Sequence, residues 1–450
     1  MTSKNSGSEY GSLTERGSSS DKAKRESGRI KTSPTFRLGL IFTRSAQKPW
    51  KLLWLPLSIL WLLVTVVRER LGHIPRFSDF EEFESDNEKR DCIVVFPTNG
   101  VGFGHFTRVL AISKRLKKLN PKLEIIFFTT MPTLHILQEE GFPAYHLPGR
   151  KKFQNMGPST WNEITEEILA NVFAIHRPKA FIFDGTYPYR GMLNAIKRRE
   201  DILRIWIRRR NFKKKHSGLP VDSFSHFDLL INPGDSVEEQ IEEKINLPAA
   251  VSCDPIILLE REDLLPKESL RWRLGVPLDA TLAYVQLGAG RVNDIVSDLW
   301  IVLQSLNERG IFVVIGESML GSRIDPDEFD NVRILRDYPN SKYYNSFDFS
   351  IIAGGYNSYH ESISFSIPSI CIPNESTGMD DQMKRARVAE GKGAMLVIRD
   401  VTIENLDSAL DTIMDDSKRE KMKSACDSLR KPNGANQVAS HIVDLLGNIN

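Results

Sequence analysis

Short apolar runs alternate with amphipathic stretches along the chain from residue 92 onward. The runs are five or six residues long, which is typical of strands buried on both faces of a parallel sheet. The stretches between them repeat apolar residues with the spacing of a helix. The pattern therefore predicts an α/β fold with doubly wound parallel sheets.

The predicted strands fall into two groups, separated by a connector that contains Pro255 and Pro266. The first group covers residues 92–96, 123–128, 180–184, 203–208 and 228–232, and the second covers residues 281–287, 311–316, 332–335, 349–354, 369–373 and 394–398. We expect two tandem Rossmann-like domains, at residues 92–270 and 271–450. Their ligand should lie in the cleft between them, at the carboxyl ends of the strands.

The segment before the first domain has a different composition. Residues 1–48 are rich in serine and basic residues, which predicts a disordered basic tail. Residues 1–51 hold 11 Lys/Arg against 4 Asp/Glu, although the whole chain of 450 residues carries a formal net charge of only +2. This near-neutral balance argues against a nucleic-acid-binding protein.

Residues 52–67 contain no charged side chain and are flanked by basic residues and Trp50. We predict a membrane anchor at residues 49–72, followed by an acidic linker at residues 73–91. The apolar run starts too late for a signal peptide and is shorter than the roughly 20 residues of a comfortable span. An in-plane or re-entrant anchor, with both ends on the cytoplasmic face of the membrane, fits the basic flanks better than a crossing helix.

A glycine-rich loop follows the first predicted strand. Gly102 and Gly104 let the backbone approach a ligand, and the next helix start favours an anion. His105 directly after them could take a proton from a hydroxyl group, and Asp184 at the end of another strand could orient it. The structural alternatives are a helix-capping histidine and a turn aspartate. An NAD enzyme is disfavoured, because no acidic residue closes the second strand near residue 128.

Residues 352–382 are the most informative stretch. A strand ends at Gly355, and Asn357 and Ser358 open a helix whose amides could hold a diphosphate. Glu361 could accept hydrogen bonds from a ribose diol. The structural alternative is a capping box formed by Ser358 and Glu361.

The pattern GGYNS-x-x-E, followed by Pro368, Pro373 and an Asp-Gln pair, resembles the nucleotide-sugar signature of GT-B glycosyltransferases. These include UDP-glycosyltransferases and MurG-like enzymes. Ala353 stands where plant-type members of the family have a phosphate-binding histidine, so the chain resembles the MurG-like branch more. The resemblance implies a UDP-sugar donor, a catalytic base and a phosphate loop. The implied donor residues are Gly288, Gly290, Arg291, Tyr338, Gly355, Asn357, Ser358, Glu361, Asp381 and Gln382.

Within that set the resemblance assigns separate roles. Gly355, Asn357 and Ser358 would hold the diphosphate, and Gly288 with Gly290 would form a second phosphate loop. Arg291 would neutralise charge on the leaving group. Tyr338 would lie in the loop at the base ring, and Asp381 with Gln382 would contact sugar hydroxyls. His105 would be the base, with Asp184 behind it.

A basic stretch follows the strand at residues 203–208. It consists of Arg208, Arg209, Arg210, Lys213, Lys214 and Lys215. The stretch is either a solvated loop or a patch that contacts lipid headgroups or a phosphate-bearing acceptor. The four cysteines lie far apart, so no Cys-ligated zinc site is expected.

Together these features predict an inverting glycosyltransferase at the cytoplasmic face of the cell membrane, anchored through residues 52–67. It would move a sugar from a UDP-sugar to a lipid-linked or cell-envelope glycan acceptor. We expect no metal and no cofactor beyond the UDP-sugar co-substrate. The alternatives are a UDP-sugar 2-epimerase of the same architecture and a non-catalytic subunit that binds nucleotide or lipid.

Overall fold

The computed structural model describes residues 33–47, 49–71, 89–98, 102–150, 156–209, 222–237, 249–288, 295–316, 329–375 and 380–447. The chain divides into two compact units, residues 1–87 and residues 88–450. Each is described by itself.

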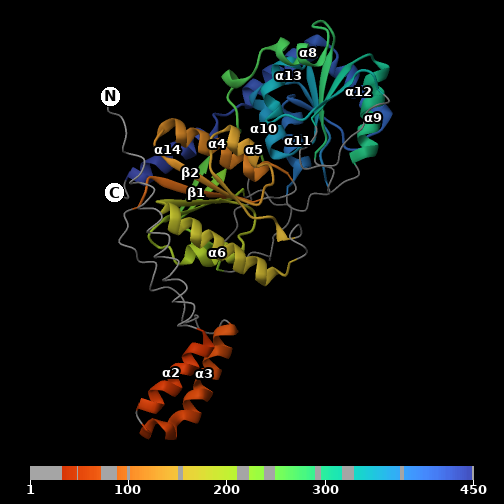
Figure 1. The fold of residues 1–450 in the computed structure, drawn as a ribbon. Coiled ribbons are helices and arrows are strands. Elements are labelled where there is room, and N and C mark those ends of the chain that lie inside the picture. Colours follow the sequence, from red (N-terminus) through yellow and green to blue (C-terminus); the bar gives the residue numbers. More distant parts are fainter. Residues whose placement is uncertain are drawn as a thin grey trace, which may run out of the picture. The chain divides into compact units, whose positions relative to one another are not determined.

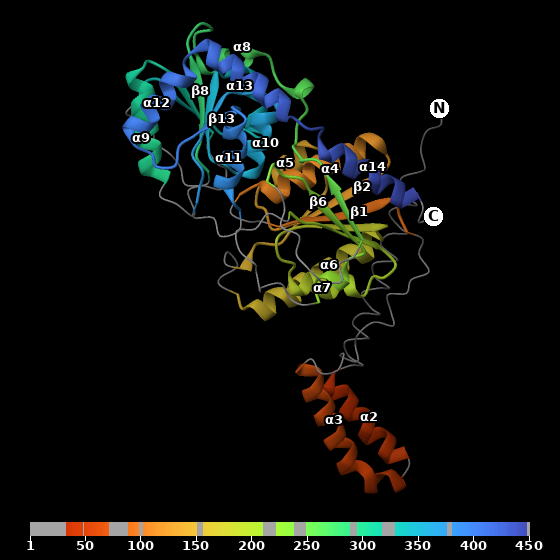
Figure 2. The same cartoon turned by 180° about the vertical axis from the view of Figure 1, so that it is seen from behind.

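The first unit contains a helical hairpin. Helices α2 (Pro34–Gln47) and α3 (Leu55–Arg70) lie side by side and are joined through the 3-10 helix η1 (Pro49–Trp54) (Figures 1 and 2). Near the open end, Arg37 Nη1 donates to both carboxylate oxygens of Glu69, each at 3.0 Å. Within the described residues, no helix is both long and apolar enough to cross a membrane.

The expectation of a disordered tail is wrong for residues 34–47. This segment places Phe36, Leu38, Ile41 and other apolar residues among polar ones, and α3 covers part of that apolar surface. The rest of the predicted tail, residues 1–32 and residue 48, lies outside the described residues, as does most of the predicted acidic linker.

The second unit begins with a seven-stranded sheet in the order β3-β2-β1-β4-β5-β6-β7, with every pair parallel. Its strands are β1 (Cys92–Pro97), β2 (Glu124–Thr129), β3 (Ala144–His146), β4 (Ala180–Asp184), β5 (Leu203–Ile207), β6 (Leu229–Pro233) and β7 (Ala249–Cys253). Helices α4 (Gly104–Leu119) and α5 (Leu134–Glu139) pack on one face, and α6 (Pro158–His176) and α7 (Arg190–Lys197) pack on the other.

A second parallel sheet has the order β10-β9-β8-β11-β12-β13. Its strands are β8 (Leu282–Gln286), β9 (Phe312–Gly316), β10 (Val332–Leu335), β11 (Phe349–Ile352), β12 (Ser369–Cys371) and β13 (Met395–Val397). Its helices are α8 (Lys267–Leu274), α9 (Ile295–Glu308), α10 (Tyr356–Ser364), α11 (Gln382–Gly391), α12 (Ile403–Ile413) and α13 (Asp416–Leu429). The prediction of two parallel-sheet α/β domains is confirmed.

In each sheet, the strand order reverses between two central strands. These are β1 and β4 in the first sheet and β8 and β11 in the second. The chain leaves neighbouring strands toward opposite faces at such a point, which opens a crevice at their carboxyl ends. The loops after these four strands are therefore the places to look for a site.

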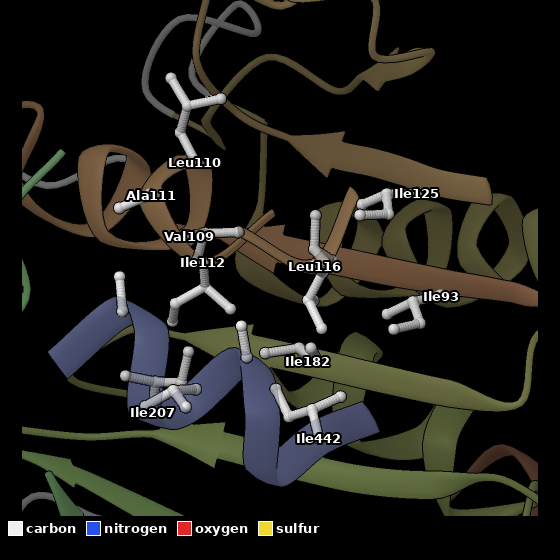
Figure 3. Packing of buried hydrophobic residues seen from close by; sticks show 14 of the residues in the cluster. Ile93, Val109, Leu110, Ala111, Ile112, Leu116, Ile125, Ile182, Ile207 and Ile442 are labelled. Carbon is white, nitrogen blue, oxygen red and sulfur yellow. The ribbon is translucent and has the colours of Figure 1, made fainter. Parts of the chain in front are cut away.

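The last helix, α14 (Gly434–Gly447), packs on the first sheet rather than the second. Figure 3 shows Ile442 of α14 beside Ile182 of β4 and Leu116 of α4. Where α14 begins, a Cβ on Gly434 would meet the carbonyl oxygen of Asp254 at 1.9 Å, so only glycine fits there. The range predicted for the second domain thus includes a helix that completes the core of the first.

We predict that Ile442→Ala lowers the free energy of unfolding by about 2–5 kcal/mol, because it removes a fully buried side chain from that core. Ile403→Ala is the matched control, since Ile403 is 51% exposed, and it should cost less than about 0.5 kcal/mol. Urea unfolding of both variants measures the difference. Equal effects of the two changes would contradict this packing of α14.

Candidate active site

His105 and Asp184 meet at the crevice of the first sheet. Asp184 is the last residue of β4 and lies beside Pro97, the last residue of β1. His105 lies in the first turn of α4, which begins directly after the glycine-rich loop. Its Nδ1 is 2.7 Å from Oδ1 of Asp184, whose side chain is fully buried. The predicted pair is therefore brought together.

Arg108 completes this group and was missed by the sequence analysis. Its Nε donates to Oδ2 of Asp184 at 3.0 Å, and its Nη2 donates to Oδ1 at 2.7 Å. Arg108 lies three residues after His105, so both side chains project from the same face of α4. That spacing was the signal available in the sequence.

The charges fix the protonation states of the group. Burial alone would raise the pKa of Asp184, but Arg108 and His105 outweigh it and hold that pKa below its ordinary value. Burial lowers the pKa of His105, against the opposing pull of Asp184. His105 is therefore neutral at neutral pH. Nδ1 lies 2.7 Å from Oδ1 of Asp184 and 2.8 Å from Nη2 of Arg108. In the tautomer whose Nδ1–H donates to Asp184, Nε2 is the proton acceptor.

A second polar group lies at the crevice of the other sheet. Helix α10 begins at Tyr356, and its N-cap residue is Gly355, so Asn357 and Ser358 stand inside the first turn. This excludes the capping-box explanation for Ser358 and Glu361, because a capping box needs Ser358 at the N-cap. The Oδ1 atom of Asn357 is buried and has no hydrogen-bond partner among the described residues.

Glu361 is the carboxylate of this second group. Ser341 Oγ donates to its Oε1 at 3.0 Å. Burial raises the pKa of Glu361 to about 7, and the hydrogen bond from Ser341 only partly offsets that effect. A hydrogen-bond donor from a ligand would favour the charged form. Gly288, two residues after the end of the neighbouring strand β8, has φ +106, a conformation that favours glycine.

Arg385 joins the two domains through contacts that the sequence did not suggest. From α11, its Nη2 donates to Asp235 Oδ2 at 2.7 Å in the first domain and to Asp380 Oδ1 at 2.7 Å in the second. Its Nη1 donates to the carbonyl oxygen of Gly354 at 2.6 Å. A buried guanidinium therefore ties the loop before α10 to the first domain.

Tyr356 lies between the two polar groups. Its ring centroid is 4.7 Å from the guanidinium carbon of Arg209, 5.6 Å from that of Arg108 and 5.8 Å from that of Arg385. Its hydroxyl donates to the carbonyl oxygen of Gly234 in the first domain at 2.9 Å. The first turn of α10 is thus in direct contact with the His105 group.

Other predicted donor residues have structural contacts. Tyr338 forms a 2.9 Å hydrogen bond with Thr107 of α4, so its side chain also bridges the domains. Asp381 caps α11 by accepting from the amide of Lys384 at 3.0 Å. Gln382 accepts from the amide of Asn374 at 2.9 Å. Gly102 lies just before the start of α4, and Gly104 is its first residue.

The predicted basic patch is wrong for Arg208. Its side chain is buried, with the guanidinium over the rings of Trp206 and Phe224, so it cannot face lipid headgroups. Arg209 turns toward the second domain, where its Nη2 donates to Asp380 at 3.2 Å. The remaining predicted members Arg210, Lys213, Lys214 and Lys215 lie outside the described residues, as do Gly290 and Arg291.

Comparisons with known proteins agree with this arrangement. Residues 316–439 match the family model of the glycosyltransferase family 28 C-terminal domain. The UDP-N-acetylglucosamine–N-acetylmuramyl-(pentapeptide) pyrophosphoryl-undecaprenol N-acetylglucosamine transferase of Thermosipho africanus is 23% identical over 343 residues, covering 73% of this chain and 93% of that protein. Over most of its length, the chain is thus similar to MurG-type glycosyltransferases.

Solved structures show that this glycosyltransferase has the GT-B fold. MurG of Acinetobacter baumannii is similar with a TM-score of 0.52 and 13% identity, over 79% of this chain and 100% of that one. UGT71G1 of Medicago truncatula, complexed with UDP-glucose, is similar with a TM-score of 0.51 and 15% identity, over 80% and 98% of the two chains. The fold predicted from the sequence is confirmed for the two α/β domains.

We predict that His105 of this glycosyltransferase titrates below its ordinary pKa of 6.5, because burial disfavours the charged ring. Asp184→Asn should lower that pKa further, since it removes the negative charge that favours the protonated form. NMR titration of the ¹³C-labelled histidines measures the pKa of His105 in the wild type and in Asp184→Asn. The resonance that disappears in His105→Gln is the one that belongs to His105. A pKa above 6.5, or no change in Asp184→Asn, would contradict this electrostatic picture.

Proposed function

We propose that this glycosyltransferase transfers a sugar, with inversion, from a UDP-sugar to a lipid-linked or cell-envelope glycan acceptor. The observation that carries the proposal is the neutral His105, held by Asp184 and Arg108, in contact through Tyr356 with the first turn of α10. This arrangement supports a proton acceptor that acts beside a helix start, and helix starts favour anions. A direct displacement reaction needs both.

His105 acts on the acceptor. Nε2 takes the proton from the acceptor hydroxyl as that oxygen attacks the anomeric carbon of the sugar. Asp184 stabilises the ring as it becomes positive, and Arg108 keeps Asp184 ionised. Attack from the side opposite the diphosphate inverts the anomeric centre.

The first turn of α10 acts on the donor. Backbone amides of Asn357 and Ser358, with Gly355 before them, meet the diphosphate, and the helix dipole stabilises the charge that develops as UDP departs. The Gly288 loop, with Gly290 and Arg291, supplies further phosphate contacts. Glu361 accepts from the ribose hydroxyls. These groups carry out the electrostatic work without a divalent cation.

The acceptor class follows from two features. The Thermosipho africanus relative is named for a pyrophosphoryl-undecaprenol substrate, which is lipid-linked. In this chain, the hairpin exposes large apolar side chains, among them Leu57, Leu60 and Trp61, which are 57%, 58% and 68% exposed. A hairpin embedded in one leaflet at the cytoplasmic face would hold the enzyme at a membrane-bound acceptor.

The experiment that tests the proposed function compares His105→Ala with Glu361→Gln in EDTA. His105→Ala should lower kcat about 10²–10⁴-fold and leave UDP binding unchanged, because it removes only the base. Glu361→Gln should weaken UDP binding, seen as a smaller rise in melting temperature with UDP. Each variant is the control for the other. Full turnover in His105→Ala, or loss of wild-type turnover in EDTA, would contradict the proposed chemistry.

We further predict that Leu60→Glu with Val64→Glu abolishes binding to vesicles of anionic lipid, because it places two charges on the exposed surface of α3. Ile403→Glu is the matched control, since it adds a charge at an exposed position of the second unit. Flotation of the full-length variants with vesicles measures binding. Flotation of the double variant to the wild-type extent would mean that the hairpin is not the anchor.

A further inference from the structure

Three side chains with metal-binding atoms meet at the amino edge of the first sheet, opposite the active-site edge. Cys92 is the first residue of β1, Glu124 is the first residue of β2, and His176 is the last residue of α6. Cys92 lies beside Glu124 in the parallel pairing of β1 and β2. The sulfur of Cys92, a carboxylate oxygen of Glu124 and a ring nitrogen of His176 lie within 4.8 Å of one another.

His176 turns its Nδ1 atom toward this group. Its Nε2 is 2.9 Å from the hydroxyl of Tyr145, while its Nδ1 is buried and has no hydrogen-bond partner among the described residues. Nδ1 lies 3.9 Å from Oε1 of Glu124. Burial lowers the pKa of His176, so the ring is neutral at neutral pH. Metal-binding histidines commonly donate their other ring N–H to such a partner as Tyr145.

Glu124 is oriented by a second contact. Its Oε2 lies 2.8 Å from Nη2 of Arg90, which leaves Oε1 on the side of His176. The carboxyl end of α6 also faces this edge, and the partial negative charge of a helix carboxyl end favours a cation. Each of the three side chains is therefore held in place by its own strand or helix.

We infer that Cys92, Glu124 and His176 bind a zinc ion at the amino edge of the first sheet. A thiolate, an imidazole and a carboxylate are the ligand types that zinc takes, and a water molecule would complete a tetrahedron. Ligand atoms around zinc are about 3.3–3.7 Å apart given its bond lengths. The 3.9 Å separation of Nδ1 and Oε1 needs only a small contraction.

Zinc binding must displace the thiol proton of Cys92. Burial and the neighbouring Glu124 raise the pKa of Cys92 to about 12, so the sulfur is protonated before the ion arrives. As the sulfur–zinc bond forms, the S–H bond breaks and one proton passes to solvent. No electron is transferred. The ion would tie β1, β2 and α6 together, and it would lie at the edge away from His105.

No metal site is predicted from the sequence, because the four cysteines lie far apart in it. These ligands come from three elements far apart in the chain, and only the parallel pairing of β1 and β2 brings the first two together. This inference is independent of the proposed transfer reaction, since the residues proposed to act in that reaction lie at other places in the fold.

The test uses the full-length protein after removal of metals, titrated with Co²⁺ and then with Zn²⁺. One equivalent of Co²⁺ should produce a thiolate-to-cobalt absorption band that Zn²⁺ abolishes. At a Zn²⁺ concentration about 100-fold above Kd, the melting temperature should rise by about 3 °C or more. Both signals are independent of glycosyl transfer.

The variants decide which residues are responsible. Cys92→Ser should abolish the cobalt band, and His176→Gln and Glu124→Gln should each weaken Zn²⁺ binding about tenfold or more. Cys426→Ser is the matched control, because Cys426 is also fully buried but belongs to the other domain, and it should keep the band. If the wild type shows no band and no thermal shift, or if the band survives in Cys92→Ser, the inference is wrong. His176→Gln and Glu124→Gln keep the test valid if Cys92→Ser does not fold.

Discussion

The buried carboxylate of Asp184 is the interaction on which the active site depends. An isolated ionised carboxylate that is fully buried is very costly, so it must be paired. Arg108 pairs with both of its oxygens, and His105 contacts one of them. Because Arg108 and His105 both belong to α4 and Asp184 ends β4, this pairing fixes the first turn of α4 against the sheet. The position of His105, the proposed base, therefore follows from the need to neutralise a buried charge.

The same requirement holds the two domains together. Arg385 is fully buried and is shared by Asp235 in one domain and Asp380 in the other. Replacing Arg385 would leave Asp235 buried without this partner, a change that typically costs about 3–5 kcal/mol. Since Arg385 also binds the carbonyl oxygen of Gly354, the loop before α10 is fixed by the same contact. The contact between the domains and the position of this loop therefore depend on one side chain.

Features that depend on local sequence patterns could be predicted from the sequence. The apolar runs gave the main strands, and the position of His105 and Asp184 at strand ends placed them at one edge. The short β3 and the mostly exposed edge strand β7 were missed, because they lack a buried apolar run. Arg208 was assigned to a surface patch, because a charged residue in a basic stretch gives no sign that aromatic rings will cover it. Asp235 and Arg385 could not be paired from the sequence, since only the arrangement of the two domains brings them together.

Charge balance in the cleft limits how the donor can be held. Arg108, Arg209 and Arg385 all surround Tyr356, but each also contacts a carboxylate: Asp184, Asp380, and Asp235 with Asp380, respectively. These guanidiniums therefore supply little uncompensated positive charge to a diphosphate. Backbone amides are different, because the first turn of a helix has N–H groups without partners in the helix and no carboxylate neutralises them. In the proposed reaction, the donor's charge would then be met mainly by the start of α10, where the glycine N-cap has no side chain that could occupy these amides.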